Sequence, residues 1–242
     1  MKGYLLLHGF AGSPEDLMPV ARMIKGYGGR VLTPVLAGHG KGRDAMREVD
    51  WEDWLTSAEN GLDQLSRVCS GVSVIGFSLG ALLTVLLARD YRVVDRVVLM
   101  SPPVFTNPTE LMWGMADVLK HAKNPTGTYL KEYLRRLFRS PVRSIGELHG
   151  LMKTVEPVYR ELEKPTLILQ GGKDDLAHPK GARHIYNRIP AEEKRLVVLH
   201  RSRHLLCMDR EVERVLEETE SFLGLKETEP QRPISWSRTR HV

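Results

Sequence analysis

The chain has 242 residues, 42% of them hydrophobic and 27% charged, and this length and composition suit one soluble α/β domain with a large core. The formal net charge of +5 comes without a dense Lys/Arg run, and the two cysteines are too few for a disulfide framework, so nothing indicates a nucleic-acid groove, a disulfide-stapled fold or a metal cluster. The first apolar run is too short for a signal peptide or a transmembrane segment, and we therefore expect a cytoplasmic protein.

Apolar periodicity predicts strands and helices that alternate along the chain. The expected strands are residues 4–8, 30–35, 72–75, 94–100, 166–170 and 195–200, and the expected helices are residues 17–27, 51–68, 79–89 and 210–223. Alternating units of this kind build a mostly parallel sheet with helices on both faces. The sequence therefore predicts an α/β fold.

The segment 102–164 interrupts this alternation. It has no good strand, and it carries two helical stripes of apolar residues, within 111–119 and 130–138. Because so long a connection is unusual, we expect a helical lid inserted into a core of residues 1–101 and 165–225. The alternative is a set of ordinary crossover helices packed on the sheet.

The C-terminal residues 226–242 form a polar tail. They include two prolines and show no apolar periodicity. Such a segment cannot bury enough apolar surface to offset the entropy of ordering, so we expect it to be disordered.

The sequence GFSLG, residues 76–80, joins an apolar run to a second run long enough for a helix. One interpretation is a tight turn, because glycine and serine are both common in turns. The other is a nucleophile elbow, where a strained strand-to-helix turn holds Ser78 at the sheet edge and the glycines let strand and helix pass closely. The strand-turn-helix context favours the elbow.

Two acidic residues and a histidine follow later strands. Asp174 and Asp175 come after the fifth predicted strand, and His204 comes after the sixth. Taken singly, each has an ordinary surface interpretation. Together with Ser78 they give the chain order Ser, Asp, His, each beyond the carboxyl end of a strand. A serine nucleophile needs a base, and the base needs an orienting group, so this order indicates a catalytic triad.

Four other histidines compete with His204 as the base. His200 ends the sixth predicted strand and is less free to reach over the sheet edge. His178 follows the acidic loop, whereas His8 and His39 lie in glycine-flanked loops where they could line the site. Reach over the strand ends favours His204.

Acyl transfer also requires backbone N–H donors for the developing oxyanion. We expect one from Leu79, which follows the nucleophile at the positive end of its helix, and one from Phe10, which follows His8-Gly9. The alternative for His8-Gly9 is a turn that ends the first strand. The apolar lid suggests recognition of an acyl chain, and its expected substrate-binding residues are Met112, Trp113, Met115 and Leu119.

Six stretches together carry a family resemblance: LLLHGFAGSPEDL, PVLAGHG, DWL, VIGFSLGA, LQGGKDDLAHP and SRHLLCMDRE. They resemble the bacterial carboxylesterase and monoacylglycerol lipase branch of the α/β-hydrolase superfamily, from about residue 2 to residue 223 and most weakly across the lid. The resemblance implies an α/β-hydrolase fold with Ser78 as nucleophile, His204 as base and the Phe10 and Leu79 amides as the oxyanion hole.

The acid follows from a local pattern of the same family. The G-x-x-D pattern matches residues 171–174, so the resemblance implies Asp174 rather than Asp175 as the acid. The chain departs from the family at Arg203, where a glycine usually precedes the base. This departure puts the shape and charge of the loop before His204 in doubt.

The expected function is hydrolysis of short- to medium-chain acyl esters or monoacylglycerols through an acyl-enzyme, without a cofactor or metal. The same triad could instead serve as a thioesterase, an acyltransferase or a carbon–carbon bond hydrolase. A non-catalytic ligand-binding protein on this fold is a further alternative. The expected partner is a small-molecule ester and not a nucleic acid, and the sequence permits a homodimer.

Overall fold

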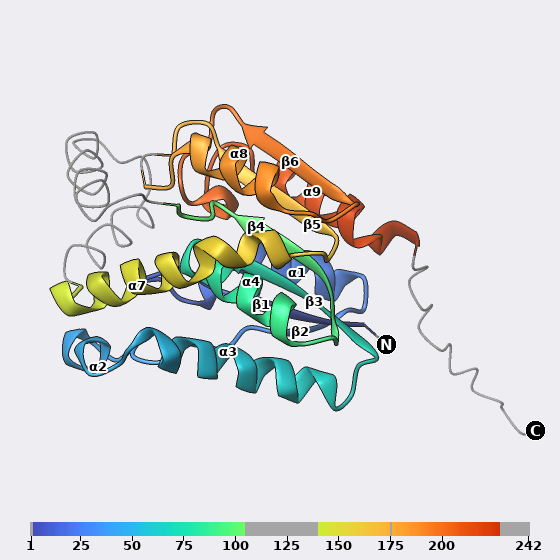
Figure 1. The fold of residues 1–242 in the computed structure, drawn as a ribbon. Helices are drawn as coiled ribbons and strands as arrows, with labels where there is room; N and C mark the ends of the chain where they lie inside the picture. The colour runs from blue at the N-terminus through green and yellow to red at the C-terminus, as the bar shows by residue number, and fades with distance from the viewer. Residues whose placement is uncertain (1, 105–139, 175, 228–242) are drawn as a thin grey trace, which may run out of the picture.

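The structure is a computed structural model that describes residues 2–104, 140–174 and 176–227. Its strands are β1 (Lys2–Leu7), β2 (Arg30–Leu32), β3 (Gly71–Phe77), β4 (Val94–Met100), β5 (Thr166–Gly171) and β6 (Lys194–Leu199). They form one six-stranded sheet in the order β2-β1-β3-β4-β5-β6, in which every neighbouring pair is parallel (Figure 1). This arrangement confirms the predicted α/β class and its mostly parallel sheet.

Helices cover both faces of the sheet. They are α1 (Met18–Gly26), α2 (Arg43–Arg47), α3 (Trp51–Ser66), α4 (Leu79–Asp90), α7 (Val142–Val158), α8 (Pro179–Arg188) and α9 (Val212–Leu223). The 3-10 turns are η1 (Pro14–Leu17), η2 (Tyr159–Glu161), η3 (Leu206–Met208) and η4 (Leu225–Glu227). On one face α3, α4 and α7 pack against one another, and on the other α1 packs against α9 (Figure 1).

Among the residues described, no helix is both long and apolar enough to cross a membrane.

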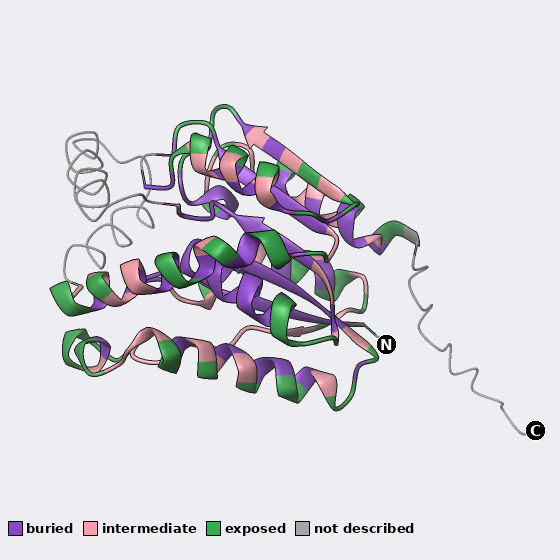
Figure 2. Ribbon diagram, viewed as in Figure 1, coloured by how far each residue is buried: buried purple, intermediate pink, exposed green. Residues whose placement is uncertain are grey.

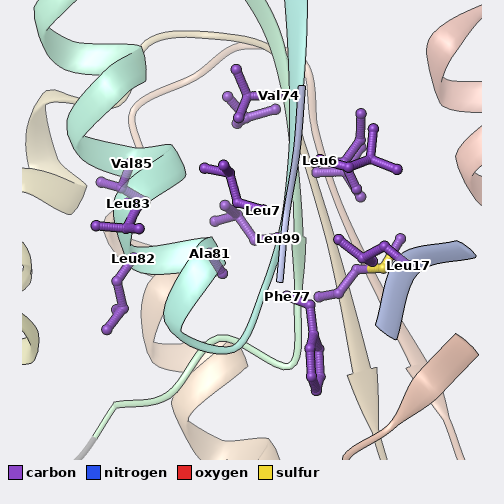
Figure 3. Close-up of a cluster of buried hydrophobic side chains, with 14 of the residues drawn as sticks. Leu6, Leu7, Leu17, Val74, Phe77, Ala81, Leu82, Leu83, Val85 and Leu99 are labelled. Carbon is purple, nitrogen blue, oxygen red and sulfur yellow. The ribbon is translucent and has the colours of Figure 1, made fainter. Parts of the chain in front are cut away.

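The core lies on both sides of the central strands, which are almost wholly buried (Figure 2). Successive side chains of a strand point to opposite faces. Thus Leu7, Val74 and Leu99 point toward α4, whereas Leu6 and Phe77 point toward the other helical layer (Figure 3). Burial on both faces explains why these strands are continuous apolar runs rather than alternating ones.

The predicted lid, residues 102–164, is described only at its two ends. Its last part contains α7, which packs against α3 and α4 and buries Leu148, Leu151 and Val155. This helix therefore belongs to the helical layer on the sheet. The expected substrate-binding residues Met112, Trp113, Met115 and Leu119 lie outside the described residues, and so do residues 228–242 of the predicted tail.

The carboxyl ends of the strands meet at one edge of the sheet. Leu7 at the end of β1 pairs with Gly76 of β3, and Gly171 at the end of β5 pairs with Leu199 of β6. The strand order reverses beside β1, because β2 lies on one side of it and the later strands follow on the other. Open α/β sheets bind ligands at such a switch point. The loop after β1 and the turn after β3 therefore lie together where a site is expected.

The turn from β3 into α4 depends on two glycines. A Cβ atom on Gly76 would lie 2.2 Å from the Gly80 carbonyl oxygen, and one on Gly80 would lie 2.0 Å from the Leu7 carbonyl oxygen. Between them Ser78 has a φ of 52°, in the left-handed region that non-glycine residues rarely adopt. The chain thus reverses sharply at Ser78, with α4 pressed against both β3 and β1.

We expect Gly80→Ala to lower the free energy of unfolding by about 3 kcal/mol or more, because the added methyl group collides with backbone that cannot move without displacing β1. The matched control is Gly146→Ala in α7, where a Cβ atom meets nothing within 4 Å. That change should stabilise the protein by up to about 1 kcal/mol through helix propensity. Urea unfolding measures both variants, and equal midpoints for Gly80→Ala and the wild type would contradict the close approach of α4 to β1.

Candidate active site

The structure brings the three expected triad residues together at the carboxyl edge of the sheet. The Nε2 atom of His204 lies 3.1 Å from the Ser78 Oγ atom. The Nδ1 atom of His204 lies 2.9 Å from Oδ2 and 3.0 Å from Oδ1 of Asp174. All three residues are buried. A base within hydrogen-bond reach of the hydroxyl, itself held by a carboxylate, is the geometry that activates a serine.

Several donors hold the Asp174 carboxylate in place. Its Oδ1 atom accepts hydrogen bonds from the backbone N–H groups of Leu176, at 2.9 Å, and Ala177, at 2.8 Å. Its Oδ2 atom accepts one from Gln170 Nε2 at 3.0 Å, and the same amide also donates to the Ala177 carbonyl. These bonds fix the carboxylate toward His204. Asp175, the rival acid, lies outside the described residues.

The loop that carries His204 is held from several sides. The Ser101 hydroxyl donates to the His204 carbonyl over 3.1 Å, and the Arg203 backbone N–H donates to Asp209 over 2.6 Å. The Phe77 ring lies against the imidazole, with 5.0 Å between the ring centroids. Among the described residues, only Ala11, Ser78 and Ser101 combine a side chain with a positive φ, so Arg203 fits without strain where the family pattern has glycine.

The rival histidines do not reach Ser78. His200 is exposed at the end of β6, and His178 is exposed at the start of α8, where its Nδ1 atom accepts the Lys180 N–H. His8 and His39 are buried in the loops after β1 and β2, and their nitrogens bond to backbone groups. Sequence reasoning missed Gln170 and Ser101, which touch the triad residues but carry no local motif.

The two expected oxyanion donors belong to the turn that carries Ser78 and to the loop packed beside it. Leu79 is the first residue of α4, so its N–H has no acceptor within the helix and lies at the positive helix end. Gly9 packs beside Ser78, since a Cβ atom there would lie 3.3 Å from the Ser78 Cβ atom. Phe10 follows and is 2% exposed, and within the described part of the chain no acceptor is found for its N–H. A buried N–H without a partner is rare, which marks this one as available to a ligand.

A cavity of about 1180 Å³ borders the loop after β1. Ala11 and Gly12 form part of its wall, and Met18, Met46 and Met208 supply flexible apolar surface. Its wall also carries Glu15 and Arg22, and the three triad residues do not line it, so this cavity adjoins the loop after β1 rather than Ser78 itself.

The thiol of Cys207, which contacts Met100 at the end of β4, is not reactive. Burial raises the pKa of the Cys207 thiol to about 12, so this cysteine stays protonated and is not a rival nucleophile. Among the residues described, no group of three or more histidine, cysteine or acidic side chains is placed to hold a metal ion.

His8 and His39 are buried as neutral imidazoles. Burial and the neighbouring His39 lower the pKa of His8 from 6.5 to about 3, and burial lowers the pKa of His39 from 6.5 to about 4. In the unfolded chain both rings would take up a proton near pH 6.5. The unfolded state therefore binds more protons than the folded state between about pH 4 and pH 6.5, and stability falls as the pH falls through this window.

We expect acidification from pH 7.5 to pH 5 to cost about 2 kcal/mol of stability for each of these two histidines, since pH 5 lies about 1.5 units below the unfolded pKa. In His39→Gln the loss on acidification should be smaller by about that amount. Urea unfolding at the two pH values measures it, with exposed His200→Gln as the control. An unchanged pH dependence in His39→Gln would show that His39 is not buried in the neutral form.

Comparisons with known proteins agree with this geometry. A family model described as serine aminopeptidase, S33 (Hydrolase_4) matches residues 3–211. The chain is 28% identical over 230 residues to a thermostable monoacylglycerol lipase of Bacillus sp. (strain H-257), covering 92% of this chain and 90% of that protein. It is 26% identical over 230 residues to a carboxylesterase of Bacillus subtilis (strain 168), covering 92% of each chain.

Solved structures share the fold. A structure described with two metagenome-derived lipolytic enzymes has a TM-score of 0.77 at 24% identity and covers 93% of this chain and 94% of its own. The Pyrococcus furiosus esterase Pf2001 has a TM-score of 0.67 at 21% identity, with 92% of this chain and 80% of that chain covered. The sheet order, the turn at Ser78 and the family match over most of the chain lead to one conclusion: the chain belongs to the Hydrolase_4 (serine aminopeptidase, S33) family of α/β-hydrolases.

Proposed function

We propose that this protein is a serine carboxylic-ester hydrolase with Ser78 as nucleophile, His204 as base and Asp174 as acid. The observation that carries the proposal is the continuous hydrogen-bond chain from the Ser78 hydroxyl through both nitrogens of His204 to Asp174. The relatives named as a monoacylglycerol lipase and a carboxylesterase support the ester class of substrate.

The first half of the reaction transfers the acyl group to the enzyme. His204 Nε2 takes the Ser78 hydroxyl proton while Oγ forms a bond to the ester carbonyl carbon. The carbonyl oxygen becomes an oxyanion, which accepts hydrogen bonds from the Phe10 and Leu79 N–H groups. The imidazolium then gives its proton to the leaving alcohol oxygen as the carbon–oxygen bond breaks. Asp174 holds His204 in the tautomer with a proton on Nδ1 and stabilises the imidazolium.

The second half releases the acid. His204 Nε2 takes a proton from water, and the resulting hydroxide attacks the acyl carbon. The second tetrahedral intermediate uses the same two N–H donors. Its collapse breaks the bond to Oγ, and the imidazolium returns the proton to Ser78. The free carboxylic acid leaves, and the enzyme regains its starting protonation state.

The substrate part of the proposal is an acyl ester of short to medium chain or a monoacylglycerol. The methionine side chains on the wall of the cavity beside Ala11 support an apolar substrate portion. We propose that Met112, Trp113, Met115 and Leu119 add to this surface. The expected homodimer and cytoplasmic location stay predictions.

An organophosphonate ester should modify the protein once, at Ser78, because it forms a stable adduct that imitates the tetrahedral intermediate. Ser78→Ala should abolish both labelling and turnover of p-nitrophenyl esters, with an unchanged unfolding midpoint. Intact-mass and peptide mass spectrometry locate the adduct. Rates on a series from acetate to palmitate, with a monoacylglycerol, a thioester and an aminoacyl anilide beside them, identify the reaction class.

Two results would overturn the proposal. The first is full ester turnover by a verified Ser78→Ala protein or labelling at another serine. The second is faster hydrolysis of the thioester or the anilide than of every ester, which would assign the same triad to a different leaving group.

The doubled acid gives a second test. Asp174→Asn should lower kcat by roughly 10⁴-fold, because an amide cannot accept the Nδ1 proton in the same way and favours the wrong histidine tautomer. Asp175→Asn is the matched control on the neighbouring residue and should lose far less. Steady-state kinetics on one p-nitrophenyl ester compares them, and a larger loss in Asp175→Asn would reverse the assignment of the acid.

A further inference from the structure

Most backbone N–H groups of residues 9–13, in the loop after β1, have a hydrogen-bond acceptor among the described residues. The Gly9 and Ser13 N–H groups bond to the buried Asp16 carboxylate, and the Gly12 N–H bonds to the Gly9 carbonyl. The Ala11 N–H bonds to His39 Nε2 at 3.2 Å. In the described part of the chain, the Phe10 N–H is thus the one left without an acceptor between residues 9 and 13.

Two hydrogen bonds fix the plane of the peptide that carries the Phe10 N–H. The carbonyl of this peptide belongs to Gly9, and it accepts from His8 Nδ1 at 2.9 Å and from the Gly12 N–H at 3.0 Å. A peptide unit is planar and its N–H points opposite to its carbonyl. Bonds that orient the Gly9 carbonyl therefore also orient the Phe10 N–H.

The next peptide plane is fixed by His39. Its Nε2 atom accepts the Ala11 N–H, and its ring packs edge-on against the Phe10 ring, with 6.3 Å between centroids. Ala11 has a φ of 55°, a conformation that persists only where neighbours hold it. Both peptide planes that flank the Phe10 Cα atom are thus held by imidazoles.

The two imidazoles hold each other's loops in a reciprocal arrangement. His8, in the loop after β1, accepts the Leu36 N–H on Nε2 at 3.1 Å. His39, in the loop after β2, donates from Nδ1 to the Ala37 carbonyl at 3.0 Å. Each ring meets a carbonyl with Nδ1 and an N–H with Nε2, so each must be neutral with its proton on Nδ1. Their centroids are 4.8 Å apart.

We propose that His39 is a positioning residue, which together with His8 locks the two peptide planes around Phe10 so that the Phe10 N–H points at the developing oxyanion. This role rests on the proposed function. His39 acts through the backbone, because its two ring nitrogens bond to the Ala11 N–H and the Ala37 carbonyl. Its effect should therefore fall on the transition state, while ground-state binding stays nearly unchanged.

The test uses two variants of His39, each of which places a polar group near the position of only one of the two ring nitrogens. Gln reaches about as far as Nε2 and can accept the Ala11 N–H, whereas Asn reaches about as far as Nδ1 and cannot. His39→Asn should lower kcat by about 10²-fold with KM within about threefold, because a small misplacement of a catalytic donor has a cost of this size. His39→Gln should retain at least about tenfold more activity than His39→Asn. Affinity for a trifluoromethyl ketone, which forms an oxyanion on Ser78, should follow kcat.

At His8 we expect the opposite order of activity for the Asn and Gln variants. This opposite order distinguishes a positioning role from a general loss of structure. Here Nδ1 holds the Gly9 carbonyl, so His8→Asn keeps the important donor and His8→Gln loses it. We expect His8→Asn to be the more active of this pair, with His200→Gln equal to the wild type. Urea unfolding of every variant gives its stability, and activity that follows stability instead of this crossed order would overturn the inference.

The outcomes also separate this inference from the proposed function. If the wild type hydrolyses esters and the Asn and Gln variants of His39 are equally active, the inference fails and the function stands. If the wild type hydrolyses no ester and is not labelled at Ser78, the function fails and the inference falls with it. If His39→Asn does not fold, the activities of His8→Asn and His8→Gln test the inference instead. A His8→Gln variant as active as His8→Asn would then overturn it.

Discussion

The close packing of α4 against the two central strands is the constraint on which the site depends. Neither Gly76 nor Gly80 has room for a Cβ atom, because each faces a backbone carbonyl at close range. The chain must therefore turn within one residue, and Ser78 takes up the strain. Every residue of α4 from Leu79 to Ala88 is buried, so the packing of the whole helix holds the turn. The packing that stabilises the core therefore also fixes the position of Ser78.

Asp174 and the two histidines His8 and His39 are buried at this edge and find their hydrogen-bond partners in two different ways. The Asp174 carboxylate accepts hydrogen bonds from two backbone N–H groups and from the Gln170 amide, and it also bonds to His204 Nδ1. His8 and His39 are uncharged and serve only backbone groups. Buried polar atoms normally have hydrogen-bond partners. The N–H groups for which the described residues supply no acceptor are therefore informative. Here one belongs to Leu79, directly after Ser78, and the other to Phe10, in the loop packed beside Ser78.

The sequence predicts the strands better than it predicts helices α7 and α8. β1, β3 and β5 are mostly apolar runs that end near glycines, and this pattern is visible without tertiary information. α7 escapes prediction because Gly146, Gly150 and Pro157 weaken its helical signal, and packing against α3 and α4 decides its conformation. α8 buries only Ala182 and Ile185, so its apolar stripe is too short to recognise.

The supporting residues of the site are hidden from sequence reasoning for a related reason. The expected triad residues follow the carboxyl ends of strands. In a parallel sheet all these ends lie at the same edge, so chain order alone groups the residues. Ser101 and Gln170 also follow or end strands, but their role depends on which carbonyl or carboxylate they meet. The same holds for His8 and His39, which were expected in loops beside the site but whose tautomers follow only from their backbone partners. A catalytic group is identified by its chemistry, whereas a positioning group is identified by its neighbours, and neighbours are a property of the folded chain.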